Sequence, residues 1–286
     1  MRPPAATGAE RRLHFSCTSL PDGVALKACG SRRETRCPSC ASVYRADARH
    51  LVRAGLAGGK GVDEAIVTHP AVLVTLTAPS FGTVHAARSG APCHIRVPRR
   101  HCPHGRPLAC FERHDGANEL VGSPLCPDCY DYEGAVLHNA ATPELWRRTT
   151  IYVARHLAAV LGLTQAETRR RIRLSFCRVA EFQCRGVVHL HAVVRADGLD
   201  GGVPPVDAEQ LAAACLHAAR AVSVPHPRGM ARWGRELDAQ VLDRAHGRAQ
   251  RVAGYVAKYA TKSSEDTGVG FTRGRRARCA PLSDTP

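Results

Sequence analysis

The chain has 286 residues, 44% of them hydrophobic and 23% charged, which is enough for one sizeable core or two modest domains of ordinary globular composition. This composition excludes a collagen, a largely disordered chain and a membrane-spanning protein. Forty lysines and arginines against 25 aspartates and glutamates leave a net charge of +15, so we expect a polyanionic partner, above all nucleic acid. Because the first residues lack the apolar core of a signal peptide, we expect a cytoplasmic protein with no membrane partner.

The predicted elements begin with a helix over residues 43–56 and a buried strand over 71–77, whose β-branched apolar residues are bounded by prolines. A further helix begins at Thr142, with Pro143 in its first turn, and ends at Gly162. The remaining elements are a short helix over 164–171, two strands over 173–183 and 187–195 that form a hairpin, a helix over 207–222, a strand over 232–242 and a helix over 251–262. Together they predict an α/β (α+β) fold, a mostly antiparallel sheet with flanking helices.

Most of the 13 cysteines gather in two segments, each with a Cys-Pro-x-Cys sequence. In a reducing compartment such a tight turn presents two thiolates to a tetrahedral ion, so we expect structural Zn²⁺ rather than disulfides. The expected ligands of the first segment are Cys17, Cys29, Cys37 and Cys40. In the second segment the candidates beside Cys126 and Cys129 are Cys102, His104 and Cys110, of which we expect Cys102 and Cys110. Reduced structural cysteines without metal are the alternative.

His189 and His191 stand two residues apart in the strand sequence VVHLHAVV, so both imidazoles project from one face of the sheet. If a three-residue loop over 184–186 closes the hairpin, Glu181 lies opposite His189. Two imidazoles and a carboxylate form a ligand set suited to a divalent metal, with open positions for a substrate phosphate. A pair of core histidines held by hydrogen bonds is the alternative.

The sequence YVAKYATK carries Tyr255 and Tyr259 one helical turn apart, hence on one helix face, with Lys258 and Lys262 on an adjacent face. A phenol with a pKa of about 10 is a weak nucleophile at neutral pH. An enzyme that uses one therefore needs cations or a metal nearby to stabilise the phenolate and the charge of a phosphoryl transition state. The alternative is an ordinary amphipathic helix with solvated lysines.

Three motifs, in this order, resemble those of the HUH endonucleases that initiate rolling-circle replication. They are VLVTLTAPSFG at residues 72–82, EFQCRGVVHLHAVVRADG at 181–198 and GYVAKYATKS at 254–263. The sequences CGSRRETRCPSCASVYRADA, and PLCPDCYDY followed by PELWRRTT, extend the similarity to the RepSA-type replication initiators of actinobacterial plasmids. The resemblance covers most of residues 29–262.

The resemblance implies a metal-dependent enzyme that nicks and rejoins single-stranded or hairpin origin DNA, with the host helicase and polymerase as further partners. His189 and His191 would hold Mg²⁺ or Mn²⁺, with Glu181 as the third ligand. One of the two tyrosines would attack the scissile phosphate and stay joined to the 5′ end. Each tyrosine is followed three residues later by a lysine, as in the YxxK element of single-nucleophile relatives.

On this interpretation residues 14–57 form a cysteine-rich zinc-binding region, and residues 68–262 form the HUH endonuclease domain with a zinc-knuckle insertion at 93–130. Residues 263–286 form an unstructured tail. Family members usually run well past the last motif, whereas this chain ends 24 residues after Lys262, which suggests a truncated copy. Two other functions stay open. One is a zinc-ribbon nucleic-acid-binding protein without catalysis, such as a decayed initiator. The other is an HUH transposase or relaxase, which shares the site but acts on different DNA.

Overall fold

A computed structural model describes residues 28–95, 101–116, 118–199, 202–242 and 248–261. Gly30–Gly270 form one compact unit, and Met1–Cys29 with Phe271–Pro286 form another. All helices and strands named below belong to the first unit, and the expected tail over 263–286 lies outside the described residues. None of the described helices combines the length and the hydrophobicity that a bilayer crossing requires.

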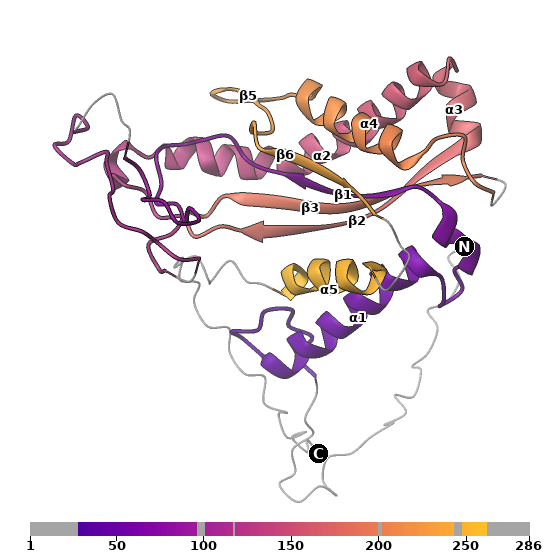
Figure 1. The fold of residues 1–286 in the computed structure, drawn as a ribbon, viewed down its shortest axis with the longest axis horizontal. Helices are drawn as coiled ribbons and strands as arrows, with labels where there is room; N and C mark the ends of the chain where they lie inside the picture. Colours follow the sequence, from indigo (N-terminus) through magenta and orange to yellow (C-terminus); the bar gives the residue numbers. More distant parts are fainter. Residues whose placement is uncertain (1–27, 96–100, 117, 200–201, 243–247, 262–286) are drawn as a thin grey trace, which may run out of the picture. The chain divides into compact units, whose positions relative to one another are not determined.

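An antiparallel sheet of four strands lies at the centre of the first unit, in the order β2-β3-β1-β6 (Figure 1). Its strands are β1 (Ala71–Leu76), β2 (Ile172–Phe182), β3 (Val188–Gly198) and β6 (Leu237–Val241). The central strand β3 is buried along almost its whole length, whereas the edge strand β2 is largely exposed or half-buried. The predicted α/β (α+β) class, with a mostly antiparallel sheet and flanking helices, is confirmed.

One face of the sheet carries α2 (Tyr132–Val160) and α4 (Ala208–Ala221), with the short α3 (Gln165–Arg171) following α2 (Figure 1). Alternation along β3 directs Leu190 and Val194 to this face. They pack there with Leu145, Leu157 and Leu211 in the main hydrophobic core. This core contains most of the largest fully buried side chains of the unit.

The opposite face carries α1 (Pro38–Ala57) and α5 (Arg248–Thr261) (Figure 1). Val193 of β3 packs here with Val52 of α1 and Val256 of α5. Because His189 and His191 are separated from Val193 by even numbers of residues, they project to the same face. Strand alternation therefore places the histidine pair on the side of the sheet that α5 covers.

The long helix α2 differs from the prediction. It begins at Tyr132 instead of Thr142, because Asp131 accepts a hydrogen bond from the backbone N–H of Gly134 and caps the helix. Pro143 therefore lies inside α2 rather than in its first turn. The strand predicted over 232–242 is limited to β6. The pattern misses the hairpin of β4 (Val224–His226) and β5 (Gly229–Ala231), and the 3-10 helices Glu64–Thr68 and Pro127–Cys129.

The segment between β1 and α2 has little regular structure. Its described residues contain one short 3-10 helix and isolated β-bridges, with no α-helix and no named strand. The second of the two predicted cysteine segments lies in it. From here on we refer to residues 83–130, which include the predicted zinc-knuckle segment 93–130, as the insertion.

Candidate active site

The hairpin of β2 and β3 has the register that the sequence predicts. Glu181 pairs with His189 across the two strands. The backbone N–H of Gln183 donates to the carbonyl oxygen of Val187 at 3.0 Å, which closes the predicted three-residue loop. The loop ends at Gly186, whose φ of 76° is a left-handed conformation that favours glycine. This register brings a carboxylate to the same strand pair as the two imidazoles.

Asn139 of α2 holds the loop in place. Its Nδ2 atom donates to the carbonyl oxygen of Gly186 at 2.7 Å, and its Oδ1 atom accepts from the backbone N–H of Val188 at 2.9 Å. A single side chain thus satisfies two backbone groups at the point where β3 begins. The sequence pattern does not single out Asn139, because its partners are 47 and 49 residues away.

His189 and His191 project side by side from β3. Their rings are nearly parallel, with an interplanar angle of 12° and centroids 4.9 Å apart. Nδ1 of His191 lies 3.2 Å from Oγ1 of Thr75, and Nδ1 of His189 lies 3.1 Å from the amide nitrogen Nε2 of Gln183. Both rings are therefore oriented through Nδ1, as in histidines that ligate a metal through Nε2. For His189 this requires the amide oxygen of Gln183 to face Nδ1, an orientation reached by a 180° turn of the amide.

The Nε2 atom of His189 is buried and has no hydrogen-bond partner among the described residues. Burial, and next the charge of His191, lower the pKa of His189 to about 4, so this ring is neutral at pH 7. A neutral imidazole with a buried, unpartnered nitrogen fits a divalent cation. Oε2 of Glu181 lies 3.3 Å from Nε2 of His191. These three residues are not among the described groups of three or more side chains whose ligand atoms all lie within 4.8 Å of one another.

Tyr255 of α5 lies against His191. The two rings meet edge to face, with centroids 5.4 Å apart and an interplanar angle of 82°. The neighbouring Ala253 and Val256 are buried in the core between α5 and the sheet, which fixes the orientation of the helix. Tyr255 itself is 39% exposed, so its phenol can be reached by a ligand. Lys258 is exposed in the last turn of the same helix.

The other two residues of the predicted tyrosine helix are described less fully. Tyr259 lies within α5, but its side chain is not among the described parts of the structure. Lys262 lies outside the described residues. The roles expected of both stay predictions.

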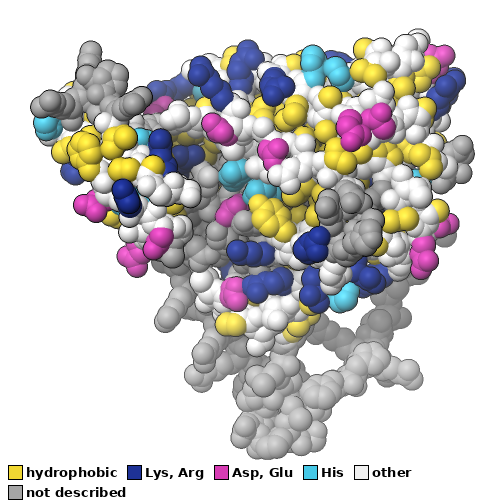
Figure 2. All heavy atoms as spheres, in the orientation of Figure 1, with side chains coloured by type: hydrophobic (Ala, Val, Ile, Leu, Met, Phe, Trp, Pro, Cys, Tyr) yellow, Lys and Arg dark blue, Asp and Glu magenta, His cyan; other side chains and the backbone are white. Residues whose placement is uncertain are grey.

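Basic side chains gather on the face that carries α1 and α5. Figure 2 shows lysine and arginine side chains over these two helices, next to a group of histidines. The exposed basic residues of the helices include Arg49, Arg53, Arg251 and Lys258. Together with the net charge of +15, this surface is suited to contacts with nucleic-acid phosphates.

The same sheet face carries a buried ionic group that the sequence does not predict. Asp197 of β3, only 3% exposed, accepts hydrogen bonds from Arg195 at 2.6 Å and from Ser175 at 2.6 Å. His69 lies 2.9 Å from the same carboxylate, and Arg195 also donates to the carbonyl oxygen of Gly55 in α1. Burial alone would raise the pKa of Asp197, but these hydrogen bonds lower it to about 2. The group ties α1 and the segment that precedes β1 to the sheet.

A group of cysteines and one histidine lies in the insertion. Its members are Cys102, His104, Cys126 and Cys129, whose donor atoms all lie within 4.8 Å of one another. Sγ of Cys102 lies 3.6 Å from Sγ of Cys126, and Nδ1 of His104 lies 3.2 Å from Sγ of Cys129. Backbone and thiol hydrogen bonds lower the pKa of Cys102 to about 6, although burial acts in the opposite direction. We call these residues the Cys126 group; three thiols and one imidazole are a donor set suited to zinc.

The assignment of Cys110 to this group is wrong. Cys110 lies in a different group, with His85, Cys93 and His114, and His104 takes its expected place. The cause is an isolated β-bridge between Cys110 and His94, with N–H···O distances of 2.8 and 2.9 Å. This bridge places Cys110 beside the residues that follow Cys93. Sequence spacing alone could not reveal this pairing.

The first cysteine segment is only partly described. Cys37 directly precedes α1, and Cys40 lies in the first turn of this helix. Cys17 lies outside the described residues, and Cys29 belongs to the other compact unit. The predicted site of four cysteines stays a prediction.

Among protein families, the model described as "Replication initiator protein, pSAM2" (RepSA) matches residues 3–284. The chain belongs to the RepSA family. A "Replication initiator protein" of Streptomyces ambofaciens is 41% identical to this RepSA chain over 280 residues, which is 92% of the chain and 58% of the relative. The chain therefore spans little more than half the length of that relative. No solved structure matches the RepSA chain described here. The predicted resemblance to the RepSA-type replication initiators is confirmed.

Proposed function

We propose that this RepSA chain initiates plasmid rolling-circle replication by nicking and rejoining one strand of origin DNA. Membership of a replication-initiator family supports the initiator role. The contact between Tyr255 and His191 carries the nicking part of the proposal. A phenol held against one of two neighbouring imidazoles, with an unpartnered nitrogen on the other, is an arrangement suited to metal-assisted attack on a phosphodiester.

His189, His191 and Glu181 are the residues that would hold Mg²⁺ or Mn²⁺. The bound cation would supply charge stabilisation to the phosphoryl oxygens as negative charge develops on them. Thr75 and Gln183 orient the imidazoles through their Nδ1 atoms, which keeps both Nε2 atoms on the ligand side. Lys258, in the last turn of α5, adds positive charge beside the phosphate.

In the reaction, the phenolate oxygen of Tyr255 forms a bond to phosphorus while the bond from phosphorus to the 3′ oxygen breaks. The phenol loses its proton, and the departing 3′ oxygen takes one up. The products are a 5′-phosphotyrosine and a free 3′-OH that the host polymerase, with the host helicase, can extend. Because one phosphate diester replaces another, the reverse reaction rejoins the strand without an external energy source. Tyr259, one turn further along α5, would serve the second cleavage with Lys262 nearby.

Incubation of the full chain with a single-stranded hairpin-origin oligonucleotide and Mn²⁺, followed by denaturing electrophoresis, tests the proposal. We expect a covalent adduct between the protein and the new 5′ end that cleavage creates. His191→Ala should abolish the adduct and leave DNA affinity almost unchanged, because affinity comes mainly from arginine contacts to phosphates. Binding without cleavage under every metal condition would favour the nucleic-acid-binding protein without catalysis. A nicked product without an adduct would exclude a tyrosine nucleophile.

A further inference from the structure

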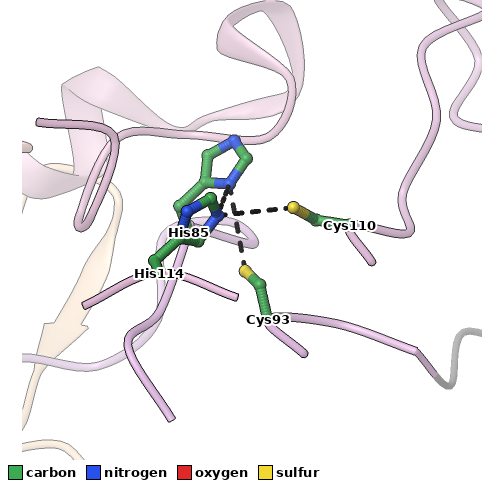
Figure 3. A group of neighbouring side chains, drawn as sticks. All are labelled: His85, Cys93, Cys110 and His114. Atoms are coloured by element: carbon green, nitrogen blue, oxygen red, sulfur yellow. Dashed lines mark hydrogen bonds between the residues drawn. The ribbon is translucent and has the colours of Figure 1, made fainter. Parts of the chain in front are cut away.

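The insertion contains a second group of metal-binding side chains, separate from the Cys126 group. Its members are His85, Cys93, Cys110 and His114, which we call the His85 group, and their donor atoms all lie within 4.8 Å of one another. Figure 3 shows the two imidazoles and the two thiols turned toward one another. We propose that the His85 group binds one Zn²⁺ ion, in addition to the ion expected in the Cys126 group.

The distances within the group support this proposal. Nε2 of His114 lies 3.1 Å from Nδ1 of His85 and 3.4 Å from Sγ of Cys110. Sγ of Cys93 lies 3.9 Å from Nδ1 of His85. Cys93 and Cys110 form no disulfide, so both sulfurs can act as ligands. Two thiolates and two imidazole nitrogens around one centre are the donor set of a tetrahedral zinc site.

Burial shows that the site would be closed. Cys93 is fully buried, and His114 and Cys110 are 6% and 9% exposed. Four protein ligands leave no position for a substrate, so the ion would be structural rather than catalytic. Two parts of the backbone set the geometry: His94 and Cys110 form an isolated β-bridge, and the backbone N–H of Ala86 points at Sγ of Cys93 at 3.2 Å.

The insertion has a physical need for such an ion. Its described residues have no α-helix and no named strand to fold around, and the small core at its base involves Phe81 and Val84 with Tyr130. Short segments of this kind do not bury enough apolar surface to fold alone, and metal binding supplies the missing free energy. The ligands of the two groups alternate along the chain, since Cys102 and His104 lie between Cys93 and Cys110, so two ions would hold overlapping parts of the insertion together.

The ion would also stabilise the active-site hairpin. The backbone of the ligand His85 forms hydrogen bonds with Ser123 and Gly122, each at 2.8 Å. Gly122 in turn touches the hairpin loop: a Cβ atom at this position would lie 3.3 Å from Cβ of Cys184. This loop precedes His189 by a few residues. Gly122 therefore connects the His85 group to the hairpin loop, because its backbone bonds to His85 and lies next to Cys184.

Zinc content measured by native mass spectrometry of the full chain tests the proposal without reference to DNA cleavage. His114→Ala should lose one ion per chain, Cys126→Ser should lose one, and the double variant should lose two. Cys177→Ser is the matched control, because Cys177 is exposed on β2 and belongs to neither group, and it should keep all ions. His114→Ala protein with the same zinc content as the wild type would overturn the proposal.

A second measurement needs no variant and so covers the case in which His114→Ala fails to fold. Cysteine alkylation of the wild type is followed by peptide mass spectrometry, with and without a chelator. Cys93 and Cys110 should resist alkylation until the chelator removes zinc, whereas Cys177 should react in both conditions. Equal reactivity of Cys93 and Cys110 with and without chelator would contradict the proposed ion.

Discussion

The carboxylate of Glu181 faces His189 in the register of the sheet, yet its Oε2 atom lies 3.3 Å from Nε2 of His191, the histidine two residues further along β3. Such diagonal neighbours across an antiparallel pair are within reach of a long side chain. Glu181 is therefore adjacent to both rings, and a small change in its side-chain torsions decides which nitrogen it approaches. This position is consistent with the proposed role of Glu181 as a third metal ligand.

Replacement of Glu181 by Gln should raise the metal concentration needed for half-maximal cleavage on the order of tenfold or more, because a neutral amide is a weaker ligand for Mg²⁺ than a carboxylate. Saturating Mn²⁺ should restore part of the rate. Glu236→Gln is the matched control, because Glu236 is exposed and precedes β6. An unchanged metal dependence in Glu181→Gln would remove this residue from the ligand set.

Thr75→Val removes the hydroxyl that lies 3.2 Å from Nδ1 of His191 and keeps a side chain of similar shape. We expect weaker metal binding and slower cleavage, each by roughly 10- to 100-fold, as for other partners that orient a ligating histidine. A titration of cleavage rate against Mn²⁺ separates this effect from a loss of fold. Thr150→Val on α2, whose hydroxyl donates only to the backbone of Arg147, should behave as the wild type.

Asp197→Asn should destabilise the fold by roughly 3 kcal/mol or more, because it leaves the buried Arg195 without its charged partner. In the folded chain the pKa of Asp197 is about 2, below its ordinary value of 3.8. The unfolded state therefore binds more protons between these values, so this carboxylate stabilises the fold above about pH 4. That contribution, about 2 kcal/mol, is lost as the pH falls toward 2.

Urea unfolding of the wild type and Asp197→Asn between pH 3 and pH 7 measures this difference. The gap between the two free energies of unfolding should be widest at neutral pH and should narrow in acid. The exposed Asp238→Asn on β6 is the control and should show almost no change. A gap that stays constant with pH would mean that Asp197 does not titrate as proposed.

Cys126→Ser should remove one zinc ion and make the insertion more sensitive to proteolysis, because structural zinc binding is coupled to folding. His104→Ala should have the same effect, since His104 lies 3.2 Å from Sγ of Cys129. Elemental analysis and limited proteolysis of the purified variants provide the readouts. Folded wild-type protein without zinc would exclude a structural ion in the Cys126 group.

Strand periodicity explains why the hairpin was predictable. The spacing of His189 and His191 sets their common face, and the three-residue loop sets the register that pairs Glu181 with His189. The proximity of Tyr255 to this pair could be expected only from the family resemblance. It depends on the packing of α5 on the same face through Ala253 and Val256, which no local pattern encodes.

The misplaced start of α2 and the misplaced Cys110 have different physical causes. Proline is favoured in the first turn of a helix, so Pro143 indicated a start near Thr142, but the cap at Asp131 and the buried face of α2 outweigh the hydrogen bond that an internal proline removes. For Cys110, the sequence offered three candidate ligands beside Cys126 and Cys129, and spacing alone did not distinguish among them. The backbone bridge to His94 places Cys110 in the His85 group.

The central claim is that Tyr255, alone or with Tyr259, becomes covalently attached to DNA. The most direct test is adduct formation with a labelled single-stranded origin hairpin in Mn²⁺, compared between wild type, Tyr255→Phe, Tyr259→Phe and the double variant, with the exposed Tyr132→Phe as control. If the two tyrosines alternate, each single variant should keep some adduct and the double variant none. If Tyr255 is the sole nucleophile, its single change should already remove the adduct. Metal binding should persist in all variants, because neither phenol is a proposed ligand. An adduct that survives in the double variant would contradict the account.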